Sequence, residues 1–217
     1  MIKLVIFDFD GLLVNSEETV FSAIEEIFLK YGHDFKWSYF LESIGLPVNT
    51  ALRNYYDHFK LPVKFEEFVA NRNEKVSEYL TDHLSLMPYV KEILEYLKKR
   101  KIMIAIATSG KKDYVFFFLK KFGIMKYFSL VTTIDDVEKG KPYPDLINKT
   151  LIDLGTDSNN ALIIEDSLSG VLAAKAAKIK TIAVPTKGIE LSLFKDADFI
   201  CNNLEEAKHR LTDILGN

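Results

Sequence analysis

Short runs of apolar residues recur along the chain, and most are followed by a segment of helical character. The runs cover residues 2–7, 102–107, 130–131, 161–164 and 180–184. Continuous apolar runs of this length are typical of strands that are buried on both faces of a parallel sheet. The helical segments are expected near residues 112–122, 170–178 and 204–215. This alternation predicts an α/β fold with a mostly parallel sheet and right-handed crossovers.

Residues 16–82 interrupt the alternation, because their apolar residues fall at helical spacing instead. Thirteen of the 27 aromatic residues lie in this segment, which is under a third of the chain. A small helical unit needs bulky side chains to form a core of its own. We therefore expect a helical cap domain over residues 16–82, inserted into a sheet-containing core formed by residues 1–15 and 83–217.

The segment Asp8-Phe9-Asp10-Gly11 follows the first apolar run directly. Side chains alternate along a strand, so Asp8 and Asp10 are expected to point to the same side. Two carboxylates at close range repel each other, and this predicts a cation beside them. Gly11 allows a sharp turn after the strand. An isolated Asp-x-Asp-Gly could equally end a strand and cap a turn, but that reading leaves the later motifs unexplained.

Two later segments have the chemistry of a phosphate site. Thr108-Ser109-Gly110 follows the second predicted strand, where a hydroxyl and free backbone N–H groups can bind phosphate oxygens. A plain helix N-cap is the alternative for this segment. Gly140-Lys141-Pro142-Tyr143-Pro144-Asp145 holds Lys141 on a loop stiffened by prolines, as a positioned cation for a phosphoryl group or a carboxylate.

A second acidic pair, in Glu165-Asp166-Ser167, ends the fourth predicted strand, and Gly170 follows it. Carboxylate oxygens at the end of a buried strand suit Mg²⁺, which prefers oxygen ligands and keeps several waters. In open α/β sheets ligands bind beyond the carboxyl ends of the strands, and every motif named above lies at such an end. The sequence thus predicts one site built from all four motifs.

Composition limits which classes of partner and which cellular location are expected. The chain has 217 residues, of which 48% are hydrophobic and 27% charged, as in ordinary globular proteins. A formal net charge of −3 argues against a nucleic-acid binder that relies on bulk positive charge. No apolar run approaches the roughly 20 residues of a membrane span. Cys201 is the only cysteine, so no disulfide framework is expected and a reducing cytoplasm is the expected location.

The four motifs, in this order and over the whole chain, resemble the haloacid dehalogenase-like (HAD) hydrolase superfamily. The helical insert is similar to the cap of its β-phosphoglucomutase and phosphoglycolate phosphatase group. The resemblance implies a Rossmann-like core and an enzyme that hydrolyses phosphomonoesters with Mg²⁺. It also implies a small phosphorylated metabolite as substrate. The run Phe116-Phe117-Phe118 is expected to be buried between the sheet and neighbouring helices, and a monomer is expected. Exposure of one of these residues would leave a dimer open.

The resemblance also assigns roles to residues. Asp8 is implied as the nucleophile that forms an aspartyl-phosphate, and Asp10 as the general acid and base. Thr108, Ser109, Gly110 and Lys141 are implied as phosphate ligands, and Lys141 also offsets the charge on Asp8. The implied Mg²⁺ ligands are Asp8, Asp10 through its backbone carbonyl, Glu165 and Asp166.

Two other functions stay open at this point. Phosphoglucomutases of the group carry a cap histidine and a cap arginine that grips a second phosphate, and this chain has Val20 and Val48 at the aligned places. A phosphatase that accepts a small, sugar phosphate-like ester is therefore expected over a mutase. A non-catalytic regulator that binds a phosphorylated metabolite is the alternative of another class, because a fold does not establish an activity.

Overall fold

A computed structural model describes residues 1–216 of the chain. The chain divides into two compact units. One unit combines Met1–Val14 with Leu86–Asn217 and contains the sheet, and the other spans Asn15–Ser85 and is helical. The two are called the sheet unit and the helical unit below. The helical unit interrupts the sheet unit just after the Asp8–Gly11 segment.

The sheet unit is built on one parallel sheet of six strands within the described residues. The strands are β1 (Leu4–Phe7), β2 (Met103–Ala107), β3 (Leu130–Thr132), β4 (Ala161–Glu165), β5 (Lys180–Ala183) and β6 (Phe199–Ile200). Their order across the sheet is β3-β2-β1-β4-β5-β6. The predicted α/β fold with a parallel sheet is confirmed. The short strand β6 was not predicted, because two residues show no periodicity.

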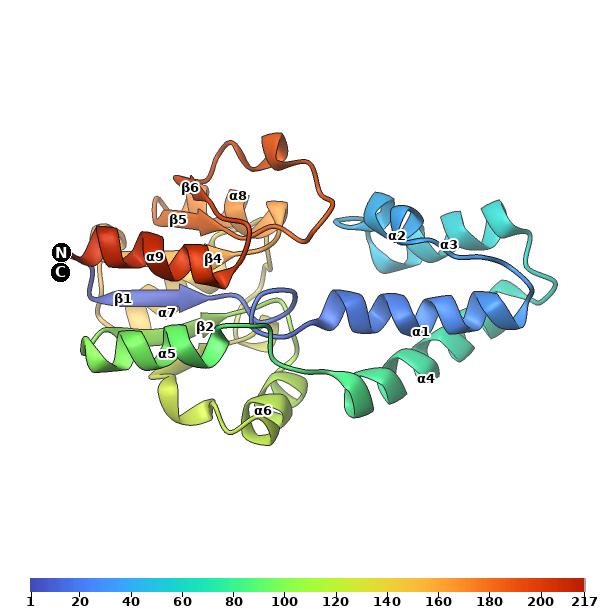
Figure 1. Ribbon diagram of the computed structural model, residues 1–217, viewed down its shortest axis with the longest axis horizontal. Coiled ribbons are helices and arrows are strands. Elements are labelled where there is room, and N and C mark those ends of the chain that lie inside the picture. The colour runs from blue at the N-terminus through green and yellow to red at the C-terminus, as the bar shows by residue number, and fades with distance from the viewer. Residues whose placement is uncertain (217) are drawn as a thin grey trace. The chain divides into compact units, whose positions relative to one another are not determined.

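Helices cover both faces of this sheet. They are α5 (Val90–Lys99), α6 (Lys112–Lys121), α7 (Asp145–Asp153), α8 (Leu168–Ala176) and α9 (Leu204–Leu215). Helices α5 and α9 contact each other on one face, and α7 and α8 contact each other on the opposite face (Figure 1). From β1 the chain adds β2 and β3 on one side and then β4, β5 and β6 on the other side, so the direction of winding reverses at β1.

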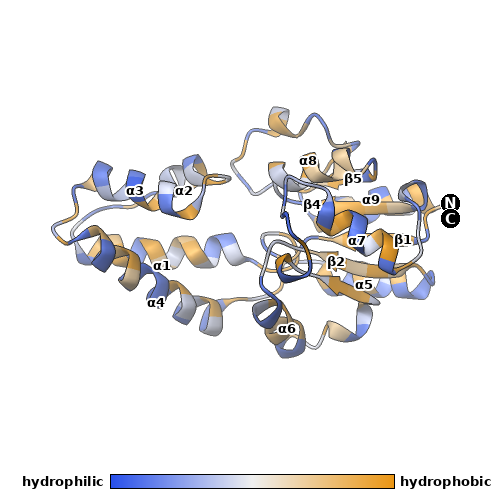
Figure 2. Ribbon diagram, turned by 180° about the vertical axis from the view of Figure 1, so that it is seen from behind, coloured by the Kyte–Doolittle hydropathy of each residue, from blue (hydrophilic) through white to orange (hydrophobic). Residues whose placement is uncertain are grey.

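The strands form where the apolar runs were found, because both faces of the sheet are covered. All four residues of β1 and all five of β4 are buried. Figure 2 shows hydrophobic residues concentrated in the strands and alternating with hydrophilic residues along the helices. Leu4 and Ile6 of β1 pack in one cluster with Leu146 and Ile147 of α7 and with apolar residues of α8. This core fixes the central strands that carry the motifs.

The helical unit consists of α1 (Ser16–Lys30), α2 (Trp37–Ser43), α3 (Val48–Phe59) and α4 (Phe65–His83). Its core is largely aromatic, as the residue pattern predicts. The Phe28 side chain is fully buried at its centre. The ring centroid of Phe28 lies 4.7 Å from those of Phe35 and Phe59, and 5.7 Å from that of Phe68. Rings at these separations stabilise a small core beyond the area that they bury.

Polar contacts join the first and last helices of the helical unit. The Tyr79 hydroxyl of α4 donates to Glu26 Oε2 of α1 at 2.5 Å, and Lys75 Nζ lies 3.0 Å from Glu26 Oε1. The hydrogen bond from Tyr79, followed by those from the two neighbouring lysines, lowers the pKa of Glu26 to about 2. The Glu26 carboxylate is therefore ionised near neutral pH, and its contacts with Tyr79 and Lys75 link α1 to α4.

No helix among residues 1–216 is long and apolar enough to cross a membrane. In the run Phe116-Phe117-Phe118 the Phe117 side chain is 52% exposed, whereas that of Phe118 is buried. The expected burial of the whole run is therefore wrong for Phe117, because three consecutive residues cannot share one face of a helix.

Replacing Phe28 tests whether the aromatic core stabilises the helical unit. Phe28→Ala is expected to lower the free energy of unfolding by about 3–5 kcal/mol, because it removes a buried ring and leaves a cavity. Urea denaturation followed by fluorescence measures the change, and Trp37, the only tryptophan, lies in the same unit. Leu29→Ala is the matched control, because that side chain is 60% exposed and its loss should cost less than about 1 kcal/mol. Equal losses in the two variants would contradict the predicted role of the ring.

Candidate active site

The register of the sheet brings three distant motifs to one level. Phe7 pairs with Ile106 of β2 and with Ile164 of β4. The next residue, Asp8, is therefore level with the end of β2 and with Glu165. The Asp8 backbone N–H donates to the carbonyl oxygen of Ile164 at 3.1 Å, so the pairing continues one residue past the strand. The site lies beside the place where the winding of the sheet reverses, as is usual for α/β proteins.

Lys141 is the cation that was predicted beside the carboxylates of the first motif. Its Nζ lies 2.6 Å from Asp8 Oδ1 and also forms an ion pair with Glu165. The side chains are almost completely buried, with 4% of Lys141, 9% of Asp8 and none of Glu165 exposed. A buried ion pair is costly to break, because removing one partner leaves an uncompensated charge. Lys141 is thus a fixed element of the site.

The pKa values in this cluster follow from burial and charge. Burial by itself would lower the pKa of Lys141, but the charges of Asp8 and Glu165 outweigh it and raise that pKa, so the lysine stays protonated. Burial raises the pKa of Glu165, and the positive charge of Lys141 opposes the rise. The site therefore holds a permanent cation between two carboxylates.

Glu165 is held from the side opposite Lys141 by the start of α8. Its Oε2 accepts hydrogen bonds from the Ser167 hydroxyl at 3.2 Å and from the Ser167 backbone N–H at 3.4 Å. The Ser167 hydroxyl in turn accepts from the Gly170 backbone N–H at 3.0 Å and caps the helix. A Cβ atom at Gly170 would lie 2.0 Å from Oε2 of Glu165. Gly170 is required here because no side chain fits against the carboxylate.

The acidic residues have the chemistry of a magnesium site. One carboxylate oxygen from each of Asp8, Glu165 and Asp166 lies within 4.8 Å of the others, and all three residues are buried. Three carboxylates and one lysine leave an excess of negative charge in a region of low dielectric, which a divalent cation would offset. Carboxylate oxygens are ligands that Mg²⁺ prefers, so the residues present fit this ion.

The Thr108–Gly110 turn lies between the first motif and the Lys141 loop. Thr108 is buried, and its Oγ1 accepts from the Gly110 backbone N–H at 3.0 Å. Ser109 is exposed. A Cβ at Gly110 would lie 3.3 Å from both Asp10 Oδ2 and Thr108 Oγ1, and one at Gly140 would lie 3.8 Å from the Ser109 hydroxyl. Gly110 thus lies close to both the Asp10 carboxylate and the Thr108 hydroxyl, and Gly140 lies close to Ser109.

Asp10 is only partly exposed, and its carboxylate has a partner that the sequence did not reveal. The Tyr114 hydroxyl donates to Asp10 Oδ1 at 2.8 Å. Tyr114 lies in the first turn of α6, just after the Thr108–Gly110 turn. A polar ring at the start of that helix is the signal that could have pointed to it. Gly11, with a φ of 71°, makes the predicted turn directly after Asp10.

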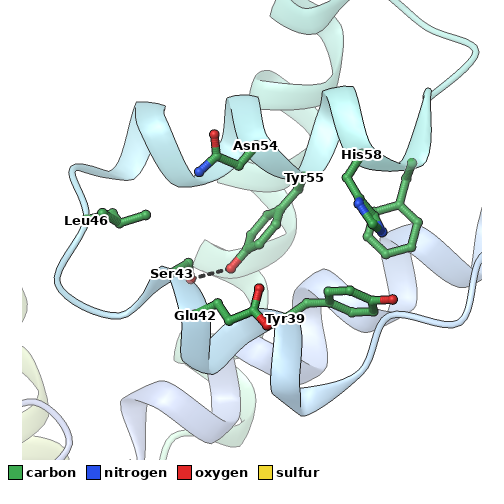
Figure 3. Close-up of a pocket in the computed structure, with 8 residues that line it drawn as sticks. Tyr39, Glu42, Ser43, Leu46, Asn54, Tyr55 and His58 are labelled. Atoms are coloured by element: carbon green, nitrogen blue, oxygen red, sulfur yellow. Dashed lines mark hydrogen bonds between the residues drawn. The ribbon is translucent and has the colours of Figure 1, made fainter.

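The helical unit has a separate hollow between α2 and α3. It has a volume of about 200 Å³ and is lined by Tyr39, Glu42, Ser43, Leu46, Asn54, Tyr55, His58 and Phe59 (Figure 3). The Tyr55 hydroxyl donates to Ser43 across it. None of the residues expected to react or to bind a metal lines this hollow. It offers aromatic rings and polar groups, but no cluster of buried charges.

Comparison with known families gives one match over most of the chain. The family model described as haloacid dehalogenase-like hydrolase matches residues 5–184. The matched range contains every motif described above, from Asp8 to Gly170.

Individual relatives resemble the chain over both units. A phosphorylated carbohydrates phosphatase from Thermotoga maritima is 30% identical over 178 residues, which are 82% of each chain. A bifunctional riboflavin kinase/FMN phosphatase from Arabidopsis thaliana is 29% identical over 201 residues, or 92% of this chain, but the chain spans only 53% of that relative. A crystal structure from Thermotoga maritima, described as a candidate β-phosphoglucomutase, superposes with a TM-score of 0.83 at 27% identity and covers 98% of this chain and 100% of its own.

Gly170→Ala tests whether the glycine is needed to admit Glu165. Alanine normally stabilises a helix by about 1 kcal/mol relative to glycine. Here we expect a loss of roughly 1–3 kcal/mol in the free energy of unfolding, because the new Cβ would displace a buried carboxylate. Urea denaturation measures the change. In a Glu165→Ala background the same substitution should be neutral or stabilising, and an equal loss in both backgrounds would contradict the explanation.

Proposed function

The chain belongs to the haloacid dehalogenase-like hydrolases and is a phosphohydrolase, and we propose that it hydrolyses a small phosphomonoester through an aspartyl-phosphate on Asp8. The observation that carries this proposal is the buried Lys141 ammonium group, which contacts both Asp8 and Glu165 at the ends of two neighbouring strands. A carboxylate held against a fixed cation at an edge where ligands bind suits attack on phosphorus. The relative named for phosphorylated carbohydrates supports a sugar phosphate as substrate.

The proposed reaction has two steps. In the first, a carboxylate oxygen of Asp8 attacks phosphorus in line, the bond from phosphorus to the ester oxygen breaks, and Asp10 gives a proton to that oxygen. In the second, Asp10 takes a proton from water, the water oxygen attacks phosphorus, and the bond between phosphorus and Asp8 breaks. The products are an alcohol and inorganic phosphate, and both aspartates return to their starting state.

Positive charge and hydrogen-bond donors hold the phosphoryl group in this scheme. Lys141 and the Thr108 hydroxyl bind its oxygens, together with Ser109 and the backbone of Gly110. Phosphoryl transfer depends mainly on such positioning and on charge stabilisation. The close approach of the Thr108–Gly110 turn to Asp10 supports this arrangement, since the acid and the phosphate ligands need to act on adjacent oxygens.

Magnesium is proposed as the cofactor. Asp8, Glu165 and Asp166 would hold it with their carboxylates, and Asp10 with its backbone carbonyl. When bound, Mg²⁺ supplies positive charge that offsets the repulsion between the substrate phosphate and the carboxylates. The buried acidic cluster supports this choice, because its oxygens are already gathered in one place.

A phosphosugar mutase is the second candidate, since one similar crystal structure is described as a candidate β-phosphoglucomutase. A mutase needs polar groups that hold a second phosphate, and Val20 and Val48 occupy the places where the resemblance predicts them. A regulator that binds a phosphorylated metabolite without turnover is the remaining alternative. Its weakness is that a binder has no need of the acid and base carboxylate at Asp10.

Phosphate release from a panel of phosphomonoesters, with and without Mg²⁺, tests the proposed activity. Asp8→Asn is expected to reduce kcat by about 10³-fold or more, because the amide cannot act as the nucleophile. Thermal unfolding of the variant checks that it folds, and Asp157→Asn, an exposed acid elsewhere in the sheet unit, is the control. No phosphate release, with glucose 6-phosphate formed from β-glucose 1-phosphate, would establish the mutase instead. Binding of a phosphorylated metabolite without either reaction would favour the regulator.

Metal binding can be tested without turnover. At a concentration about 100 times its Kd, Mg²⁺ should stabilise the folded protein by about 2.7 kcal/mol and raise its Tm accordingly. Asp166→Asn should abolish most of this rise, because it removes a charged ligand, whereas Asp157→Asn should keep it. A rise in Tm that is the same in all three proteins would show that the ion binds elsewhere.

A further inference from the structure

The contact between Tyr114 and Asp10 joins the helix after the second motif to the first motif. The two residues are separated by 104 positions in the sequence, and the hydroxyl donates to Oδ1 at 2.8 Å. The Tyr114 ring makes edge contacts with two other rings, at a centroid distance of 5.9 Å from Phe9 and 5.1 Å from Phe118. Because Phe9 precedes Asp10 directly, the ring is packed against the same segment that its hydroxyl contacts.

The two oxygens of the Asp10 carboxylate have different surroundings. Oδ1 accepts from Tyr114, whereas Oδ2 lies beside Gly110, at 3.3 Å from the position of a Cβ there. The Thr108 hydroxyl lies at the same distance from that position. The oxygen that does not contact Tyr114 is therefore on the side of the Thr108–Gly110 turn. A rotation of the carboxylate would break the tyrosine hydrogen bond and change which oxygen faces the turn.

Tyr114 is suited to hold this orientation because its hydroxyl donates to the carboxylate and its ring is packed against two other rings. The ring has few rotatable bonds and is fixed by Phe9 and Phe118, so little conformational entropy is lost in keeping the contact.

We propose that Tyr114 is the positioning residue for Asp10, whose carboxylate it fixes so that the second oxygen faces the ester oxygen of the substrate. The inference rests on the proposed function, in which Asp10 is the general acid. Tyr114 itself would touch neither the phosphorus nor the ester oxygen. A purely structural role is the alternative, and in that case a phenylalanine of the same shape would serve equally well.

The dependence of the rate on the leaving group separates the two roles. An ester with a poor leaving group, such as phenyl phosphate, needs a proton on the departing oxygen, whereas p-nitrophenol departs readily as its anion. A misplaced acid should therefore slow the first ester much more than the second. A general loss of structure would slow both esters alike, because they share the phosphoryl group and the ring.

The experiment compares kcat/KM of the wild type and Tyr114→Phe for these two esters at saturating Mg²⁺. We expect a loss of about tenfold for phenyl phosphate and of less than about threefold for p-nitrophenyl phosphate, with inhibition by inorganic phosphate unchanged. Tyr127→Phe is the matched control, since its hydroxyl contacts Glu95 on an exposed surface at 3.4 Å. Thermal unfolding of each variant reports whether it folds.

A double-mutant cycle with Asp10→Asn completes the test. If Tyr114 acts through Asp10, adding Tyr114→Phe to Asp10→Asn should cause little further loss for phenyl phosphate. Equal losses for the two esters, or losses that multiply in the double variant, would overturn the inference and leave the proposed function intact. If the wild type hydrolyses neither ester nor any phosphomonoester of the panel, the proposed function fails and the inference fails with it.

Discussion

The ion pairs of Lys141 with Asp8 and Glu165 are the interaction on which the rest of the site depends. Burying these carboxylates at the ends of β1 and β4 would be unfavourable without a cation between them. Lys141 lies in neither β1 nor β4 but in the loop before α7, so the fold has to hold that loop in place. The buried position of the Glu165 carboxylate also explains Gly170, because a side chain at that position would overlap with it. One electrostatic constraint therefore sets the residues of three separate segments.

Parallel pairing converts sequence positions that are far apart into neighbours. Phe7 is paired with both Ile106 and Ile164, so the residues that follow the three strands meet at one edge of the sheet. All of these strands are buried on both faces, which leaves the edge as the place where polar side chains can gather. The chemistry of the site is accordingly carried by loops, while its geometry is determined by the hydrophobic core beneath them.

The helical unit has no sheet among its described residues, and its core is formed by aromatic rings packed around Phe28. A hydrophobic core and a polar contact between α1 and α4 allow this short segment to form a compact unit. The charged cluster lies wholly in the sheet unit. The buried charges of the candidate active site are thus in one unit, and the aromatic core is in the other.

The sequence by itself determined the fold class, since continuous apolar runs mark buried strands, and the strand ends then mark Asp8, Thr108 and Glu165. The turn at Gly11 was also predictable, because it follows from the position of this glycine after the strand and from the ease with which glycine adopts a positive φ. Other features depended on long-range packing. The strand β6 is too short to leave a pattern, and the contact of Tyr114 with Asp10 requires knowing where α6 packs against the end of β1. The sequence also suggested a cation near Asp8. Only the tertiary structure decided that Lys141 pairs with Glu165 as well as with Asp8. The reason is that the distance between the two carboxylates depends on strand register and not on spacing along the chain.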